Sequence, residues 1–157
     1  MITTNVMRIL EKQGVSYTSR EYEYDENDLS GVHAAEALGL PPEKVFKTLV
    51  TAGDKLPHCV FVIPVAEELD LKKCAAASGN KRVELIHVKE LLPLTGYVRG
   101  GCSPIGMKKR FPTFIDETAL MNDFISVSAG QRGVQVCVAP EALIELLGAT
   151  ACDLIKY

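Results

Sequence analysis

No Cys-x-x-Cys pair occurs among the five cysteines of this 157-residue sequence. Five is also an odd number, and the spacing of Cys59, Cys74, Cys102, Cys137 and Cys152 does not match a zinc knuckle. The pattern argues against both a zinc site and a disulfide framework. We therefore expect no metal, and we expect most of these cysteines to be small buried hydrophobic residues in a reducing cytosol.

A strong charge of one sign and a long apolar run are also missing. The net charge is -3, so no overall positive potential would attract nucleic acid. No apolar run approaches the ~18 residues of a membrane helix, and residues 1–5 lack the features of a signal peptide. These absences predict a cytoplasmic protein without membrane contact. Positive charge gathers in only two groups, Lys72-Lys73 with Lys81-Arg82, and Arg99 with Lys108-Lys109-Arg110.

Hydrophobic residues make up 47% of the chain, which predicts one packed domain spanning residues 1–157. Apolar spacing and capping residues predict helices ending at Gly14, Gly39, Gly79 and Gly148, and a short helix around Glu90. Strands are predicted at 15–24, 45–51, 58–65, 83–86, 97–98, 113–115, 125–128 and 134–138. No Gly-x-Gly-x-x-Gly follows the first strand, so the class is α+β and not a doubly wound nucleotide-binding fold.

The segment from Thr95 to Gly106 holds four glycines and one proline within twelve residues. The consecutive Gly100 and Gly101 allow the backbone to approach a ligand and to direct several N–H donors at one oxygen. Pro104 stiffens the end of the segment. Such a loop suits a carboxylate, a phosphate or the oxyanion of an acyl transfer, although an ordinary glycine-rich turn is the alternative.

The same loop offers two nucleophiles, and neither fits a known catalytic pattern. Ser103 precedes a proline, which cannot supply the N–H that follows the serine in a Gly-x-Ser-x-Gly elbow. Cys102 has no histidine at a spacing that would pair with it, although the sequence contains three. We expect Cys102 to line or support the loop, and a covalent cysteine mechanism is the less favoured alternative.

Lys47 is the one charged residue on its face of the strand at 45–51, where the alternation also places Val45, Leu49 and Thr51. Such a lysine either extends its ammonium group past a sheet margin into water or offers a fixed cation to an anion in a pocket. The sequence leaves both interpretations open.

The order of these features resembles that of the YbaK/EbsC-type aminoacyl-tRNA deacylases, which are relatives of the editing insertion domain of bacterial prolyl-tRNA synthetase. The matching segments are Phe46 to Leu49, Pro64 to Lys73, Gly96 to Gly106 and Val127 to Gly130. The resemblance implies a mixed, mostly antiparallel, barrel-like sheet with short surrounding helices. It also implies hydrolysis of the ester between a wrong amino acid and tRNA, above all in Cys-tRNA(Pro) and also in Cys-tRNA(Cys). The implied partners are the aminoacylated tRNA 3′ end and prolyl-tRNA synthetase, with no metal or cofactor.

The resemblance also assigns roles to residues. Lys47 would engage the tRNA end, while backbone amides at Gly100 and Gly101 would hold the aminoacyl carbonyl group. The residues implied in substrate binding are Tyr22, Cys102, Ser103, Pro104 and Gly130. The thiol of the substrate cysteine would attack its own ester carbonyl. Gln135 stands where some relatives carry an aspartate, so no carboxylate role is carried over to this position.

Two alternatives remain open from the sequence. One is an Ala-tRNA(Pro) deacylase of the same fold, because one small group in a pocket changes binding by only ~1 to 3 kcal/mol. The other is a module that binds tRNA or a synthetase without hydrolysis. The intact Lys47 and the Gly100 to Pro104 loop count against this second alternative.

Overall fold

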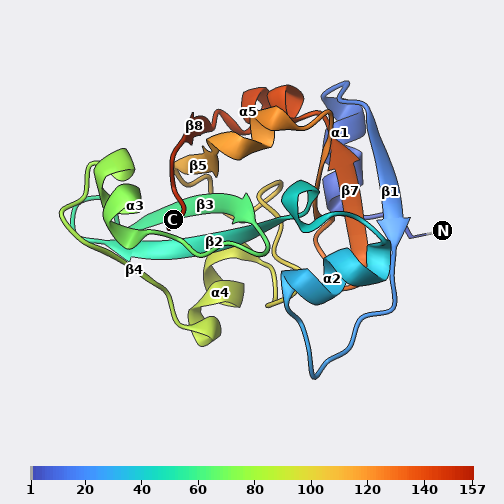
Figure 1. Cartoon of the computed structure of the whole chain (residues 1–157), viewed down its shortest axis with the longest axis horizontal. Helices are drawn as coiled ribbons and strands as arrows, with labels where there is room; N and C mark the ends of the chain where they lie inside the picture. Colours follow the sequence, from blue (N-terminus) through green and yellow to red (C-terminus); the bar gives the residue numbers. More distant parts are fainter. Residues whose placement is uncertain (1) are drawn as a thin grey trace.

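Two β-sheets form the centre of the protein in the computed structural model, which describes residues 2–157 (Figure 1). One antiparallel sheet has the order β1-β7-β6, with β1 (Tyr17–Glu21), β7 (Val134–Val138) and β6 (Ile125–Ser128). The other has the order β4-β2-β3-β5-β8, with β4 (Val83–Leu85), β2 (Phe46–Gly53), β3 (His58–Pro64), β5 (Thr113–Asp116) and β8 (Thr150–Cys152). A bridge between Val45 and Ser126 connects the two sheets. Only the β3–β5 and β5–β8 pairs are parallel, so the predicted α+β class with a mixed, mostly antiparallel sheet is confirmed.

Short helices cover these sheets. They are α1 (Asn5–Lys12), α2 (Gly31–Leu38), α3 (Leu71–Ser78), α4 (Val88–Thr95) and α5 (Pro140–Leu147), with 3-10 turns at Pro42–Lys44 and Glu117–Met121. The Ser30 hydroxyl accepts the amide of His33 at the start of α2, and the Asp70 carboxylate accepts two amides at the start of α3. In Figure 1, α2 and α4 lie on one side of β2, and α5 lies on the other. No helix among residues 2–157 is long and apolar enough to cross a membrane.

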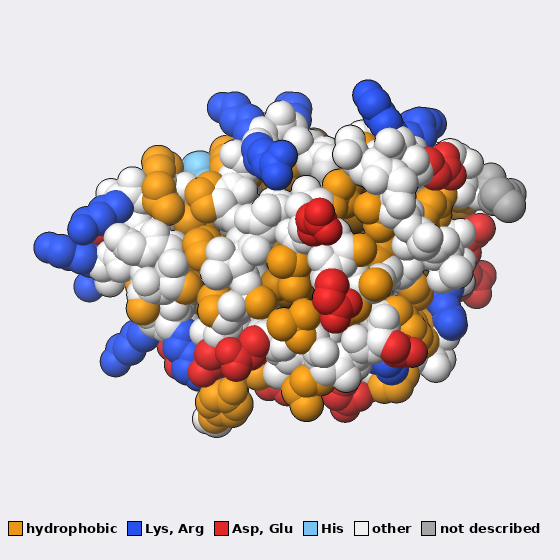
Figure 2. Space-filling model, turned by 90° about the horizontal axis from the view of Figure 1, so that it is seen from above, with side chains coloured by type: hydrophobic (Ala, Val, Ile, Leu, Met, Phe, Trp, Pro, Cys, Tyr) orange, Lys and Arg blue, Asp and Glu red, His pale blue; other side chains and the backbone are white. Residues whose placement is uncertain are grey.

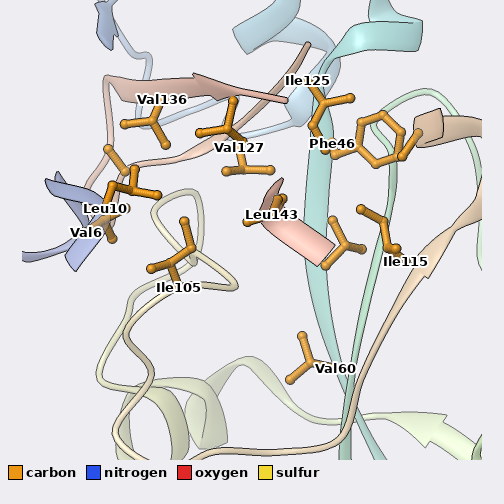
Figure 3. Packing of buried hydrophobic residues seen from close by; sticks show 14 of the residues in the cluster. Val6, Leu10, Phe46, Val60, Ile105, Ile115, Ile125, Val127, Val136 and Leu143 are labelled. Atoms are coloured by element: carbon orange, nitrogen blue, oxygen red, sulfur yellow. The ribbon is translucent and has the colours of Figure 1, made fainter. Parts of the chain in front are cut away.

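The hydrophobic core fixes the glycine-rich loop in place through Ile105. This side chain is 1% exposed and lies beside Val6 and Leu10 of α1 (Figure 3). Burial of an isoleucine contributes roughly 1.5–3 kcal/mol to folding. The loop is therefore attached to the core at its far end, and it is not a free surface turn.

The predicted strand at Tyr97-Val98 is wrong, because these residues form part of the loop. Gly96 ends α4 in the left-handed conformation (φ 84°), and the amide of Tyr97 donates to the Thr95 hydroxyl at 3.1 Å. The Tyr97 hydroxyl donates to the carbonyl oxygen of Ile105. Tyr97 thus holds the two ends of the loop together and has no neighbouring strand with which to pair.

Each of the two basic groups of the sequence has a member that is engaged in contacts within the protein. Lys73 donates to the Asp153 carboxylate and to the Ile155 carbonyl, and Arg110 donates to the Leu147 carbonyl. Figure 2 shows the face over α5, where acidic side chains lie among apolar ones and basic side chains lie at the margins. This face therefore offers no broad basic surface to a polyanion.

Candidate active site

A cavity of about 570 Å³ lies between α2, β2, the start of α4 and the segment at 99–102. Among residues 2–157, two charged residues line the cavity, Lys47 and Arg99, and no aspartate or glutamate does. A cavity with two cations and no carboxylate favours an anionic or electron-rich ligand. Many of its other lining side chains are apolar, including Phe46 and Val65.

Lys47 supplies a fixed cation to this cavity. It lies on β2 opposite Ile63, it is half-buried, and it forms no ion pair within 4.0 Å among residues 2–157. Burial lowers the pKa of the Lys47 ammonium group, and the carboxylates of Glu68 and Glu67 partly offset this effect. The surroundings therefore disfavour the cation, and an anion bound in the cavity would stabilise it.

Two residues of the glycine-rich loop that line the cavity have backbone amides without an acceptor among residues 2–157. Gly100 and Cys102 both line it, and their amides donate to no acceptor among residues 2–157. The amide of Gly101 is occupied instead, because it donates to the Val98 carbonyl oxygen at 2.9 Å. Gly100 has φ +85°, the left-handed conformation that glycine adopts readily. Gly100 and Cys102 are thus the loop amides available to a ligand.

The other predicted site residues lie outside this cavity. Ser103 is fully buried, and its hydroxyl accepts the amide of Ile105 at 3.2 Å. Pro104 and Gly101 are also buried and do not belong to the cavity wall. Gly130 lines a second, neighbouring cavity. The structure therefore brings Tyr22, Lys47, Gly100 and Cys102 into one wall, while Gly101, Ser103 and Pro104 lie behind it.

Gly101 is in contact with the backbone of the β6–β7 turn. A Cβ atom at this position would lie 3.1 Å from the Gln131 Cα and 3.1 Å from the Arg132 amide nitrogen. We expect Gly101→Val to lower the free energy of unfolding by about 1–3 kcal/mol, because backbone atoms cannot move aside easily. Thermal unfolding of Gly101→Ala and Gly101→Val should give a graded loss, and an unchanged midpoint for the valine variant would contradict this packing.

Cys102 is unsuited to act as a nucleophile. Burial raises the pKa of its thiol to about 12, and a hydrogen bond with Thr95 offsets this only in part. At pH 7 about one thiol in 10⁵ would then be ionised, and the thiolate is the reactive form. His87 lines the same cavity, which the spacing does not predict, but no hydrogen bond joins it to Cys102 among residues 2–157.

The sequence resemblance implies deacylation in this cavity, and on that expectation Cys102→Ala should retain the rate within about threefold of the unaltered protein, because the expected loop donors are backbone amides and the thiol is protonated. The rate is measured under single-turnover conditions, with the thermal midpoint as a check on folding. Loss of activity together with an acyl-enzyme trapped in mass spectrometry would restore the covalent mechanism.

Several residues of the cavity wall were not expected as site residues. Arg99 and His87 enter it from either side of α4, and Ser128 and Gln135 enter it from the β6–β7 hairpin. Gln135 accepts a hydrogen bond from the Ser126 hydroxyl at 2.8 Å, so a neutral buried hydrogen bond occupies this position. Burial raises the pKa of the Tyr22 hydroxyl, and hydrogen bonds with Gly133 and Gln135 partly offset this.

The class of protein follows from this fold and from a match to a known family. The family described as the aminoacyl-tRNA editing domain matches residues 29–146, which include Lys47, the whole glycine-rich loop and the β6–β7 hairpin. The chain belongs to the aminoacyl-tRNA editing-domain family, and the predicted family is confirmed.

Three similar proteins illustrate this family relationship. The chain is 53% identical over 143 residues to EbsC of Enterococcus faecalis, named as a candidate Cys-tRNA(Pro)/Cys-tRNA(Cys) deacylase; the match covers 91% of this chain and 87% of EbsC. A proline–tRNA ligase of Shouchella clausii is 28% identical over 100 residues, which are 64% of this chain and 17% of the ligase. A crystal structure titled as a candidate trans-editing enzyme for prolyl tRNA synthetase superposes with a TM-score of 0.83 at 24% identity and covers 99% of this chain and 100% of that one. This last likeness confirms the editing-domain fold.

Proposed function

We propose that this protein is an aminoacyl-tRNA deacylase that hydrolyses mischarged Cys-tRNA(Pro), and also Cys-tRNA(Cys), in the cavity beside Lys47. One observation carries the proposal: a cation and two unoccupied loop amides line a cavity that has no carboxylate in its wall. The name of the 53% identical EbsC supports cysteine as the amino acid and both tRNAs as carriers.

The chemistry needs little from the protein beyond positioning and electrostatics. An aminoacyl ester is already activated, so amides that stabilise an oxyanion and a fixed reactive geometry supply much of the rate increase. In our assignment the amides of Gly100 and Cys102 hold the carbonyl oxygen, and Lys47 holds the phosphate or ribose oxygens of the terminal adenosine. The Gly101 amide closes the turn, so its part in the site is to shape the loop.

The substrate supplies the nucleophile in this scheme. The cysteine thiol gives its proton to solvent water, and its sulfur adds to the ester carbonyl carbon. The bond from that carbon to the ribose oxygen then breaks, and the oxygen takes a proton from water and leaves as a hydroxyl group. Water opens the resulting four-membered thiolactone to give cysteine. The scheme needs no cofactor, and it agrees with the finding that no hydrogen bond joins a nucleophile to His87 in the cavity wall among residues 2–157.

The tRNA 3′ end is the proposed partner, and prolyl-tRNA synthetase is the proposed carrier of that tRNA. The net charge of -3 predicts weak, salt-sensitive binding of tRNA by this chain alone. A synthetase that holds the rest of the tRNA would raise the effective concentration of its 3′ end. Editing of mischarged tRNA during translation would place the protein in the cytoplasm.

Single-turnover deacylation of Cys-tRNA(Pro), Cys-tRNA(Cys) and Ala-tRNA(Pro) tests this proposal. We expect both cysteinyl esters to be hydrolysed well above their spontaneous rates and the alanyl ester to be hydrolysed more slowly. Faster hydrolysis of Ala-tRNA(Pro) would identify an alanine-specific enzyme instead. Spontaneous rates for all three, with tRNA binding retained, would identify a binding module.

A further inference from the structure

A second, more open groove of about 830 Å³ adjoins the catalytic cavity. Its walls include the chain from Glu21, the last residue of β1, to Tyr24, the segment from Gly96 to Val98, and the β6–β7 turn from Gly130 to Gly133. Tyr22 lines both the groove and the cavity. The groove and the cavity therefore meet at this one residue.

Two glycines of the β6–β7 turn leave space for the aromatic rings of this groove. A Cβ atom on Gly130 would lie 3.1 Å from the Tyr97 Cε1, and one on Gly133 would lie 3.0 Å from the Tyr24 Cδ1. Both glycines have positive φ, at +100° and +82°. The turn thus leaves room for the two rings to lie directly against its backbone, and Tyr24 remains 46% exposed.

The polar groups of the groove are of both signs. The Arg132 side chain is held in place because its Nε donates to the Arg99 carbonyl oxygen at 2.9 Å, and its terminal nitrogens donate to no acceptor among residues 2–157. Glu21 and Glu23 line the same groove. An arginine can bind phosphate, and a carboxylate can accept the exocyclic amino group of cytosine.

We propose that this groove binds the two unpaired cytidines that precede the terminal adenosine of tRNA. Aromatic rings beside a cation are the common means of holding single-stranded nucleic acid, because each base can stack on a ring. The carboxylates of Glu21 and Glu23 favour cytosine over uracil, since uracil offers an oxygen where cytosine offers an amino group. The inference rests on the proposed function, because it requires the aminoacyl adenosine to occupy the neighbouring cavity.

Equilibrium binding of short RNA strands tests the groove separately from catalysis. Fluorescence anisotropy would compare 5′-labelled strands ending in ACCA and in AUUA. We expect the unaltered protein to bind the ACCA strand at least about fivefold more tightly, and Tyr24→Ala to remove most of that difference. Tyr24→Phe keeps the ring and should retain it. Tyr157→Ala removes a tyrosine that is 94% exposed and packs on Lys73, so it serves as the matched control and should have no effect.

Equal affinity of the unaltered protein for the two strands would overturn the proposal, and this comparison does not depend on the folding of any variant. Equal effects of Tyr24→Ala and Tyr157→Ala would also overturn it. Deacylation of cysteinyl-adenosine, which has no cytidines, separates this failure from that of the proposed function. If the groove is wrong and the function is right, this small ester is still hydrolysed. If the proposed function is wrong, cysteinyl-adenosine is not hydrolysed above its spontaneous rate, whichever RNA strand the protein binds.

Discussion

Lys47→Ala is expected to lower the single-turnover rate on Cys-tRNA(Pro) by about 10²-fold or more, a loss typical of removing one electrostatic contact to the reacting group. The thermal midpoint at pH 7 should stay the same or rise. Burial lowers the pKa of Lys47, so the folded state holds this cation less favourably than the unfolded chain does. The substitution removes that cost along with the charge. Deacylation rates and thermal unfolding of the same preparation measure both effects.

Lys44→Ala is the matched control for this variant. Lys44 lies three residues earlier in the chain, forms an ion pair with Asp123 at 2.6 Å and lies over the Phe124 ring, outside the cavity. Its removal should leave the rate within about twofold, because an exposed ion pair contributes little and takes no part in the site. A Lys47→Ala variant as active as Lys44→Ala would refute the role assigned to Lys47.

The pH dependence gives the Lys47 assignment a second readout. Since burial lowers the pKa of the Lys47 ammonium group, its charge is lost at a lower pH than that of an ordinary lysine. The enzyme-dependent part of the rate, after subtraction of spontaneous hydrolysis, should fall as the pH rises through this lowered pKa. The Lys47→Ala variant should show no such fall.

Hydrolysis should also depend steeply on the thiol of the attached amino acid. On one tRNA(Pro), we expect the cysteinyl ester to react at least about tenfold faster than the seryl and alanyl esters at saturating enzyme, because a thiol is the best nucleophile of the three side chains near neutral pH. Excess EDTA should leave the cysteinyl rate unchanged. Saturating enzyme separates the chemical step from binding.

S-methylcysteinyl-tRNA(Pro) provides a control for the size of the side chain, since it keeps the sulfur and blocks its attack. Its rate should fall to that of the alanyl ester. Equal rates for cysteinyl, seryl and alanyl esters would mean that water attacks, and that Lys47 and the Gly100 and Cys102 amides orient this water.

The parts of the fold that could be predicted from the sequence depend on local interactions. The caps at Ser30 and Asp70 bind amides two or three residues away, so their residue types alone mark the helix starts. The nearly continuous run of apolar residues in β3 likewise predicts a buried strand from neighbouring residues alone. Strand β8 was missed, because it has three residues and exists through parallel pairing with β5, more than thirty residues earlier in the chain.

The candidate site could be predicted only where its residues form a local pattern in the sequence. The loop could be recognised by its glycines, and Lys47 by its isolated charge on an apolar strand. Which amides are available depends on where each N–H points, and the sequence could not show that the Val98 carbonyl occupies the Gly101 amide. His87 and Arg99 reach the cavity from opposite ends of α4, and only the fold brings them to one wall.

We propose that the ester is cleaved in the cavity between Lys47 and the glycine-rich loop. A crystal structure with cysteine joined by an amide to 3′-amino-3′-deoxyadenosine tests it most directly, because the amide replaces the ester and resists hydrolysis. We expect the carbonyl oxygen within about 3 Å of the Gly100 and Cys102 amide nitrogens, with the Lys47 Nζ beside the ribose oxygens. An analogue bound elsewhere on a protein that still deacylates Cys-tRNA(Pro) would contradict it.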